Sequence, residues 1–254
     1  MERVNKSIMN LLLVMMGVLF FLGAWQNVRA AETTGGIQAV RTIQWAAKTK
    51  KKVNAVDINT GETVLLNKNT PVVVTNRNYF RSKQARSLCN VGGHFLRIPN
   101  SLLKYKADLC TGEAGDYSDA SKEYFVNVTR NCTSATDRLI WVCLDKQRVN
   151  VFIGSPGNWK LEQTFLTSTG KAETPTKTAS DVVNFKKMDY KIEGSRVKYF
   201  VEAIGSGFHK WNLSGRFRRR IGKHTISHGC IRLVEQDAKW MFENIKPNTR
   251  VVIY

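Results

Sequence analysis

Residues 227–233 read Ser-His-Gly-Cys-Ile-Arg-Leu and place a cysteine directly after a histidine and a glycine. A thiolate is a strong nucleophile, and a nearby imidazole or cation lowers the pKa of a thiol enough to form it. The groups available to Cys230 are His209, His228 and Arg232. Gly229 allows main chain to approach closely, and backbone N–H groups beside a nucleophile can stabilise an oxyanion. Covalent catalysis by Cys230 is therefore the leading hypothesis for this stretch.

Two other chemistries are open to the same residues. His224, His228 and Cys230 are zinc-ligand types, but Gly229 interrupts the run and the flanks show no helical period. We therefore expect neither a metal nor another cofactor. A buried structural thiol is the second alternative, because cysteine is among the residues most often buried.

The N-terminus has the pattern of an export signal. A basic start precedes an apolar run from Leu11 to Trp25, and the small residues Val28 and Ala30 suit cleavage by a signal peptidase. The run is shorter than the roughly 18 apolar residues that a membrane span needs. We predict a signal peptide over residues 1–30, with a retained membrane anchor as the alternative. The protein is then exported, to the cell wall or the outer face of the cytoplasmic membrane.

The chain carries a formal net charge of +19, which draws it to polyanions. For an exported protein, anionic wall polymers or peptide carboxylates are the expected partners rather than nucleic acid, and a membrane only through an uncleaved leader. Much of the charge lies in residues 210–226, which contain no acid. We interpret this excursion either as a solvated loop or as a basic lid over the site, with Trp211 on its apolar underside.

Four cysteines stand apart from Cys230, and four can pair in three ways. Sequential pairing, Cys89 with Cys110 and Cys132 with Cys143, closes the shortest loops. The alternative is that these thiols stay reduced and buried. Either way Cys230 is left over, and an unpaired thiol in an exported protein is a candidate reactive group.

The elements that must position these residues are mostly strands. Strand-length runs rich in β-branched and aromatic residues predict a β-rich domain over residues 137–254, at Leu139–Leu144, Arg148–Ile153, Trp159–Thr167 and Val197–Ile204. Ala238, Met241, Phe242 and Ile245 recur at helical spacing and predict its one clear helix, before a last strand at Arg250–Tyr254.

The preceding residues divide by composition. Residues 31–51 are small, polar and basic and suggest a linker. Short β-like runs over residues 52–112, with a hairpin signal at Asn59-Thr60-Gly61, predict a small all-β module, for which a five-stranded SH3-like barrel is one form. Residues 113–136 are rich in Ser, Thr, Asn, Asp and Gly and suggest a connector.

His209, 17 intervening residues and then Ser227-His228-Gly229-Cys230-Ile231-Arg232 resemble the signature of the YkuD-type L,D-transpeptidases. The resemblance extends through Asn158-Trp159, Ser168-Thr169-Gly170, Thr174-Pro175 and Asp237-Ala238, and covers residues 137–254. It implies a mainly β, sandwich-like catalytic domain that works without a cofactor in peptidoglycan biosynthesis, and so in cell-wall biogenesis and cell shape.

By this resemblance, Cys230 is the nucleophile and His209 its general base. Ser227 and His228 support the site, and the amides of Gly229 and Cys230 form the oxyanion hole. Arg232 is expected to bind a substrate carboxylate. Apart from the resemblance, Trp211 on the underside of the basic excursion is a second candidate for substrate binding. Two positions depart from the family pattern. Lys210 follows the base where a small residue is common, so the partner of His209 is expected to be a main-chain carbonyl. Thr176 follows Thr174-Pro175 where the family often turns through glycine.

The implied activity is transfer of a peptidoglycan tetrapeptide stem. The cysteine attacks the carbonyl before the terminal D-alanine, D-alanine leaves, and a side-chain amine of another stem captures the thioester in a 3→3 cross-link. An L,D-carboxypeptidase would use the same cysteine with water as acceptor. A non-catalytic wall-binding protein is the alternative from another class, and the intact His209, Ser227, His228 and Cys230 argue against it.

Overall fold

The computed structural model describes residues 37–76, 85–106, 115–192, 194–211 and 220–254. Ala39–Tyr254 form one compact unit, and nearly all of the other, Met1–Gln38, lies outside the described residues, as does the expected leader. Within the described part of the chain, no helix is long and apolar enough to cross a membrane. The fold is mainly β, as predicted.

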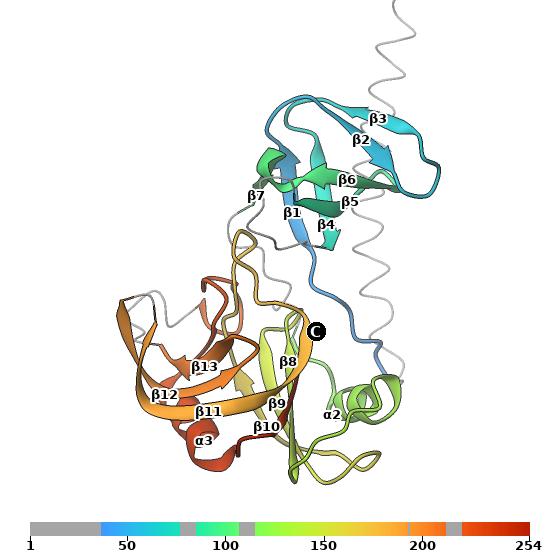
Figure 1. The fold of residues 1–254 in the computed structure, drawn as a ribbon. Coiled ribbons are helices and arrows are strands. Elements are labelled where there is room, and N and C mark those ends of the chain that lie inside the picture. The colour runs from blue at the N-terminus through green and yellow to red at the C-terminus, as the bar shows by residue number, and fades with distance from the viewer. Residues whose placement is uncertain (1–36, 77–84, 107–114, 193, 212–219) are drawn as a thin grey trace, which may run out of the picture. The chain divides into compact units, whose positions relative to one another are not determined.

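The first sheet has seven antiparallel strands in the order β3-β2-β6-β5-β4-β1-β7 (Figure 1). They are β1 Trp45–Thr49, β2 Val53–Asp57, β3 Thr63–Leu66, β4 Pro71–Asn76, β5 Arg86–Val91, β6 His94–Pro99 and β7 Leu103–Tyr105, with a short 3-10 turn at Asn100–Leu102. The predicted hairpin around Asn59-Thr60-Gly61 joins β2 to β3 and is confirmed.

Two expectations for this region are wrong. The stretch expected to be a linker, residues 31–51, contains β1, and the sheet has seven strands rather than five. In β1 the side chains of Trp45, Ala47 and Thr49 are buried in alternation. That period of two is typical of a strand, but small and basic neighbours hide it in the sequence.

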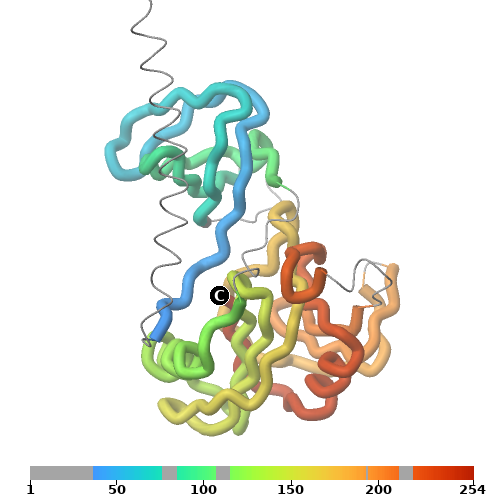
Figure 2. Tube along the Cα trace, turned by 180° about the vertical axis from the view of Figure 1, so that it is seen from behind, coloured from blue at the N-terminus to red at the C-terminus, as the bar shows by residue number. Residues whose placement is uncertain are grey.

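The second sheet has eight strands in the order β10-β9-β8-β15-β11-β12-β13-β14 (Figure 1). They are β8 Arg138–Cys143, β9 Arg148–Ile153, β10 Lys160–Leu166, β11 Ala179–Ile192, β12 Ser195–Ala203, β13 Ser206–Lys210, β14 Ile231–Leu233 and β15 Arg250–Ile253. The predicted strands appear as β8, β9, β10, β12 and β15. β15 comes last in the chain yet lies between β8 and β11. Figure 2 shows the path of the chain from behind.

The core of this sheet is centred on β8, which is buried on both faces. Leu139, Trp141 and Cys143 belong to one apolar cluster, while Ile140 and Val142 belong to another. The predicted helix is α3, Glu235–Asn244, and it packs on β12 and β13. Its Ala238 and Met241 are fully buried, so this apolar stripe holds the strand that carries His209.

The expected connector over residues 113–136 contains a helical segment. The helix α2, Asp119–Tyr124, continues into a π-turn at Phe125–Thr129. Ser118 caps it by accepting a hydrogen bond from the Ser121 N–H. Ser and Asp are common in loops, but they are also the residues that start helices, which explains the error.

The expected Cys132–Cys143 disulfide is wrong, because both side chains are free thiols buried in the cluster around Trp141. Burial raises the pKa of the Cys143 thiol to about 12. Cys89 is also buried, and Cys110 lies outside the described residues.

Candidate active site

Cys230, His209 and Arg232 come together at one edge of the second sheet. β13 and β14 run parallel, with His209 opposite Arg232. Paired positions on adjacent strands point to the same face, and so do residues two apart along one strand. Cys230 directly precedes β14, so its side chain shares a face with Arg232 and His209. Arg232 lies close enough for electrostatic interaction with both the imidazole and the thiol.

His209 is held as a neutral base. Its Nδ1 lies 2.8 Å from the Lys210 carbonyl oxygen, and the side chain is only 5% exposed. Since a carbonyl can only accept, Nδ1 carries the proton and Nε2 keeps its lone pair. Burial lowers the pKa of His209, the charge of Arg232 lowers it further, and the bond to Lys210 opposes both. The expected main-chain partner of the imidazole is therefore the carbonyl of the next residue.

Ser227 shapes the turn that presents Cys230. Its Oγ accepts a hydrogen bond of 3.1 Å from the Gly229 N–H and donates one of 2.5 Å to the Cys230 carbonyl. Gly229 has φ +121°, a conformation that a residue with a side chain rarely adopts. The 227–230 turn therefore depends on a hydroxyl at its first position and a glycine at its third.

The two amides expected to form the oxyanion hole differ in their hydrogen bonds. The Gly229 N–H donates to Ser227 Oγ at 3.1 Å. Among the described residues, the Cys230 N–H has no hydrogen-bond partner. The amide of Cys230 is thus left as a donor beside its own sulfur, and that of Gly229 is not.

A second segment, residues 168–176, binds the turn through hydrogen bonds and is called the clasp below. The Ser227 carbonyl accepts hydrogen bonds from the Lys171 N–H at 3.0 Å and from Thr174 Oγ1 at 3.2 Å. The Thr169 carbonyl accepts a bond of 3.0 Å from the Ser227 N–H. The Ser-Thr-Gly and Thr-Pro motifs of the sequence thus bind the main chain just before the cysteine.

Thr176, which departs from the family pattern, completes this clasp. Its Oγ1 donates to the Gly229 carbonyl at 2.7 Å and accepts from the Gly170 N–H at 2.9 Å. Ser206 Oγ donates to the same Gly229 carbonyl at 3.1 Å. Sequence reasoning missed both hydroxyls, since Thr and Ser in polar stretches are usually solvated and carry no positional signal.

Replacing Gly170 with alanine is expected to disrupt the clasp. A Cβ at this position would lie 2.2 Å from the Thr174 carbonyl oxygen and 2.4 Å from the Thr176 nitrogen. Both atoms are backbone, so the clasp must open to admit the methyl group. We expect the free energy of unfolding to fall by about 3 kcal/mol or more, measured by urea denaturation.

Gly157→Ala is the matched control, because a Cβ there meets nothing within 4 Å and only the φ of +81° is unfavourable. Its loss is expected to be about 1–2 kcal/mol. An equal loss in the two variants would show that crowding at Gly170 does not matter.

Behind the clasp, Gln147 joins the β8–β9 hairpin to Thr169. Its Oε1 accepts from the Thr169 N–H at 2.9 Å, and its Nε2 donates to Thr169 Oγ1 at 2.8 Å. Gln147 is fully buried and has φ +54°. A non-glycine residue in that conformation needs strong local bonds to hold it there. The sequence around it looks like an ordinary turn, so its role was missed.

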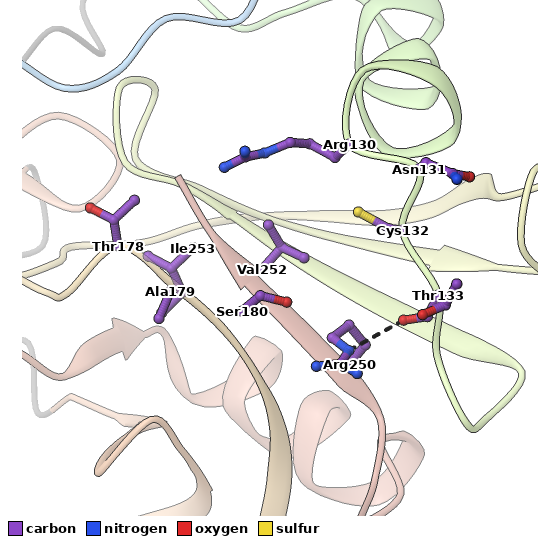
Figure 3. A pocket seen from close by; sticks show the side chains of 10 residues that line it. All are labelled: Arg130, Asn131, Cys132, Thr133, Thr178, Ala179, Ser180, Arg250, Val252 and Ile253. Atoms are coloured by element: carbon purple, nitrogen blue, oxygen red, sulfur yellow. Dashed lines mark hydrogen bonds between the residues drawn. The ribbon is translucent and has the colours of Figure 1, made fainter.

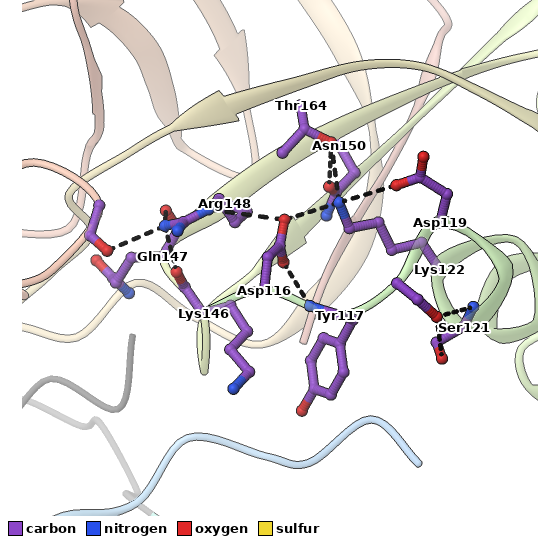
Figure 4. A network of polar contacts seen from close by, with 12 residues as sticks. Asp116, Tyr117, Asp119, Ser121, Lys122, Lys146, Gln147, Arg148, Asn150 and Thr164 are labelled. Atoms are coloured by element: carbon purple, nitrogen blue, oxygen red, sulfur yellow. Dashed lines mark hydrogen bonds and ion pairs between the residues drawn. The ribbon is translucent and has the colours of Figure 1, made fainter. Parts of the chain in front are cut away.

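Arg148 and a buried ion pair hold this hairpin in place (Figure 4). Arg148 Nη1 donates to the Lys146 carbonyl at 2.7 Å and to the Gly222 carbonyl at 3.0 Å. Its Nε lies 3.7 Å from Asp116 Oδ2, which pairs at 2.7 Å with Lys122, a residue only 3% exposed. The network thus ties the hairpin behind the clasp to the segment that enters the 227–230 turn.

Arg232 lies beside the Cys230 thiol and has hydrogen-bond donors that are not used within the described residues. Its Cζ lies 4.3 Å from the centre of the Trp211 ring, and Nη1 donates to the Ile226 carbonyl at 3.4 Å. Nε is buried and has no hydrogen-bond partner among the described residues. Burial lowers the pKa of Arg232, while the adjacent Cys230 opposes this. Trp211 therefore supports the guanidinium, which can bind an anionic group.

The other predicted residues are less closely tied to this centre. His228 is exposed on the turn, and Lys210 forms an ion pair of 2.7 Å with Glu235. No group of three metal-ligating side chains occurs in the ranges that the structure covers. Most of the basic excursion, residues 212–219, lies outside those ranges, so the lid stays a prediction.

Comparison with known sequences finds a family resemblance over the residues of this site. Residues 137–253 match the sequence model of YkuD, the L,D-transpeptidase catalytic domain. The matched stretch is a little under half of the chain. It contains both sides of the site, from Gln147 on the β8–β9 hairpin to Cys230, which precedes β14, and Arg232 on β14.

Individual relatives overlap the chain only in part. The Bacillus subtilis protein YciB, named an L,D-transpeptidase, is 67% identical over 27 residues, which are 11% of this chain and 14% of that protein. A fused zinc-dependent amidase/peptidase/peptidoglycan-binding protein of Clostridium acetobutylicum is 35% identical, with a TM-score of 0.45. The match covers 54% of this chain and 59% of that protein. An L,D-transpeptidase of Mycobacterium smegmatis is 14% identical, with a TM-score of 0.41. The match covers 88% of this chain and 96% of that protein.

Proposed function

We propose that the protein is an exported L,D-transpeptidase that forms 3→3 cross-links between peptidoglycan stems, with Cys230 as nucleophile. The observation that carries the proposal is the neutral His209, oriented by the Lys210 carbonyl, on the strand beside Cys230 in a YkuD domain. A structural cysteine needs neither an oriented imidazole nor a turn held by two sets of hydrogen bonds.

The chemistry follows from the donors and acceptors present. His209 Nε2 takes the thiol proton as the sulfur attacks the carbonyl that precedes the terminal D-alanine. The Cys230 N–H donates to the oxyanion that forms. The C–N bond then breaks, His209 returns the proton to the departing amine, and D-alanine leaves a thioester behind. A side-chain amine of a second stem attacks the thioester, with His209 again as base, and the thiol is regenerated.

Arg232 fits the recognition of the substrate. A terminal carboxylate lies next to the scissile bond in a tetrapeptide stem, so a guanidinium beside the sulfur can bind it as a charge-assisted pair. The contact of the Arg232 guanidinium with the face of the Trp211 ring limits its rotation. The net charge of +19 favours encounter with carboxylate-bearing stems and anionic wall polymers.

Incubation of the purified protein with a disaccharide-tetrapeptide is expected to give a cross-linked dimer and free D-alanine, because the thioester is resolved by an amine. Mass spectrometry of the products measures both. Tripeptide with D-alanine but no dimer would identify the carboxypeptidase alternative instead. Unchanged substrate would favour a non-catalytic wall-binding protein and contradict the proposal.

A further inference from the structure

A pocket of about 500 Å³ opens on the second sheet, apart from the residues of the candidate active site (Figure 3). It lies between the start of β11, the C-terminal strand β15 and the segment 130–133 that follows the π-turn. None of the ten residues that line it belongs to the 227–230 turn, β13 or β14. Acyl transfer therefore makes no use of this pocket.

Two arginines give the pocket its charge. The guanidinium of Arg130 lies over the ring of Tyr254, with Cζ 4.3 Å from the ring centre. Arg250 Nε donates to the Thr133 carbonyl at 3.3 Å, which leaves the two terminal nitrogens of its guanidinium. Neither arginine forms an ion pair with any carboxylate in the described part of the chain. Their positive charges are therefore held in place without being neutralised.

The two charges act on the same small region. Figure 3 shows Arg130 and Arg250 on opposite sides of Val252, with Cys132 on the same segment as Arg130. Burial raises the pKa of the Cys132 thiol, and the charges of both arginines oppose that shift. An anion in the pocket would thus be within the field of both guanidiniums.

The rest of the lining supplies neutral donors. No acidic residue lines the pocket. The exposed polar side chains at its wall are those of Asn131, Thr133, Thr178 and Ser180. Hydroxyls and amides can donate to an anion from several directions. The two non-bridging oxygens of a phosphodiester share one negative charge, and a guanidinium can bind them as a bidentate pair while neutral donors complete the site.

We propose that this pocket binds a phosphate group of a phosphodiester polymer, as a second site beside the one for the stem peptide. A polymer fits better than a small anion, because the pocket is open at the surface and the whole chain is strongly basic. The site would hold the protein on a polyanionic polymer. The inference does not depend on the proposed activity.

The test measures binding rather than catalysis. Poly(glycerol phosphate) is titrated by calorimetry into the purified protein at low ionic strength, with inorganic phosphate as competitor. Arg130→Gln together with Arg250→Gln is expected to weaken binding by about tenfold or more, since two charge-assisted contacts are lost. Arg97→Gln together with Arg196→Gln is the matched control, because it removes the same charge from exposed positions outside the pocket. It is expected to weaken binding by about twofold at most.

Ser180→Glu keeps both arginines and places a carboxylate in the pocket. It is expected to weaken binding as strongly as the double arginine variant, which guards against misfolding as the cause. Equal weakening by the pocket pair and the control pair would overturn the proposal, since only net charge would then matter. Equally tight binding of polyglutamate would overturn the assignment to phosphate.

Discussion

Cys230→Ala is expected to abolish both release of D-alanine and formation of the cross-linked dimer. Loss of a nucleophile that forms the covalent intermediate costs on the order of 10⁴-fold or more in rate, because no other group can form the thioester. Intact-protein mass spectrometry after incubation with tetrapeptide is expected to show an acylated species in the wild type and none in the variant. The turn itself should survive, since its hydrogen bonds use only the main chain of Cys230.

Cys132→Ser is the matched control for this change. Burial raises the pKa of the Cys132 thiol, so it is a poor nucleophile, and the variant is expected to keep both products. Full activity in Cys230→Ala would contradict the proposed function. Loss of activity in Cys132→Ser alone would move the nucleophile to the other face of the domain.

His209→Gln is expected to lower kcat/KM by about 10²–10⁴-fold, the usual contribution of a general base. Glutamine can still donate to the Lys210 carbonyl but has no basic nitrogen to take the thiol proton. Steady-state release of D-alanine gives the rate. The unfolding midpoint of the variant is expected to stay near that of the wild type, so the lower rate would report on catalysis and not on folding.

The pH profile provides an independent check on His209. The neutral imidazole is the active form, so activity falls as the pH drops through the pKa of this group. Burial lowers that pKa, hence the acid limb of kcat/KM is expected below about 6.5, the ordinary value for histidine. The limb should be missing in the residual activity of His209→Gln. A wild-type limb above 6.5 would contradict a desolvated base.

The sequence allowed prediction of the parts of this site that are close together in the chain or follow strong periodicity. Ser227 to Arg232 form a contiguous motif, and α3 shows an apolar stripe at helical spacing. Strands such as β9 were found to the residue, because Arg148–Ile153 is a run of strand length rich in β-branched and aromatic residues. These features are local, so composition and spacing suffice to find them.

The sequence alone could not predict the hydrogen bonds between segments that lie far apart in the chain. Thr176 and Gln147 meet the 227–230 turn and its clasp only after folding, and neither the Thr174-Pro175 motif beside Thr176 nor the turn around Gln147 shows which groups they bind. The bond from the Gly229 N–H to Ser227 Oγ depends on the backbone conformation of the turn, which the letters leave open. β11 was missed because Lys, Asp and Asn dominate a strand whose burial is irregular.

The place of β15 in the sheet has a consequence for how the protein is made. β8, β9 and β10 are synthesised before β11 to β14, yet in the strand order of the sheet the two groups are joined through β15. Leu139 of β8 pairs with Arg250, so this contact must wait until that late residue has been synthesised. Such non-local pairing slows folding. The second sheet therefore cannot be completed until the last residues of β15 have been synthesised, and β8 waits for its partner until then.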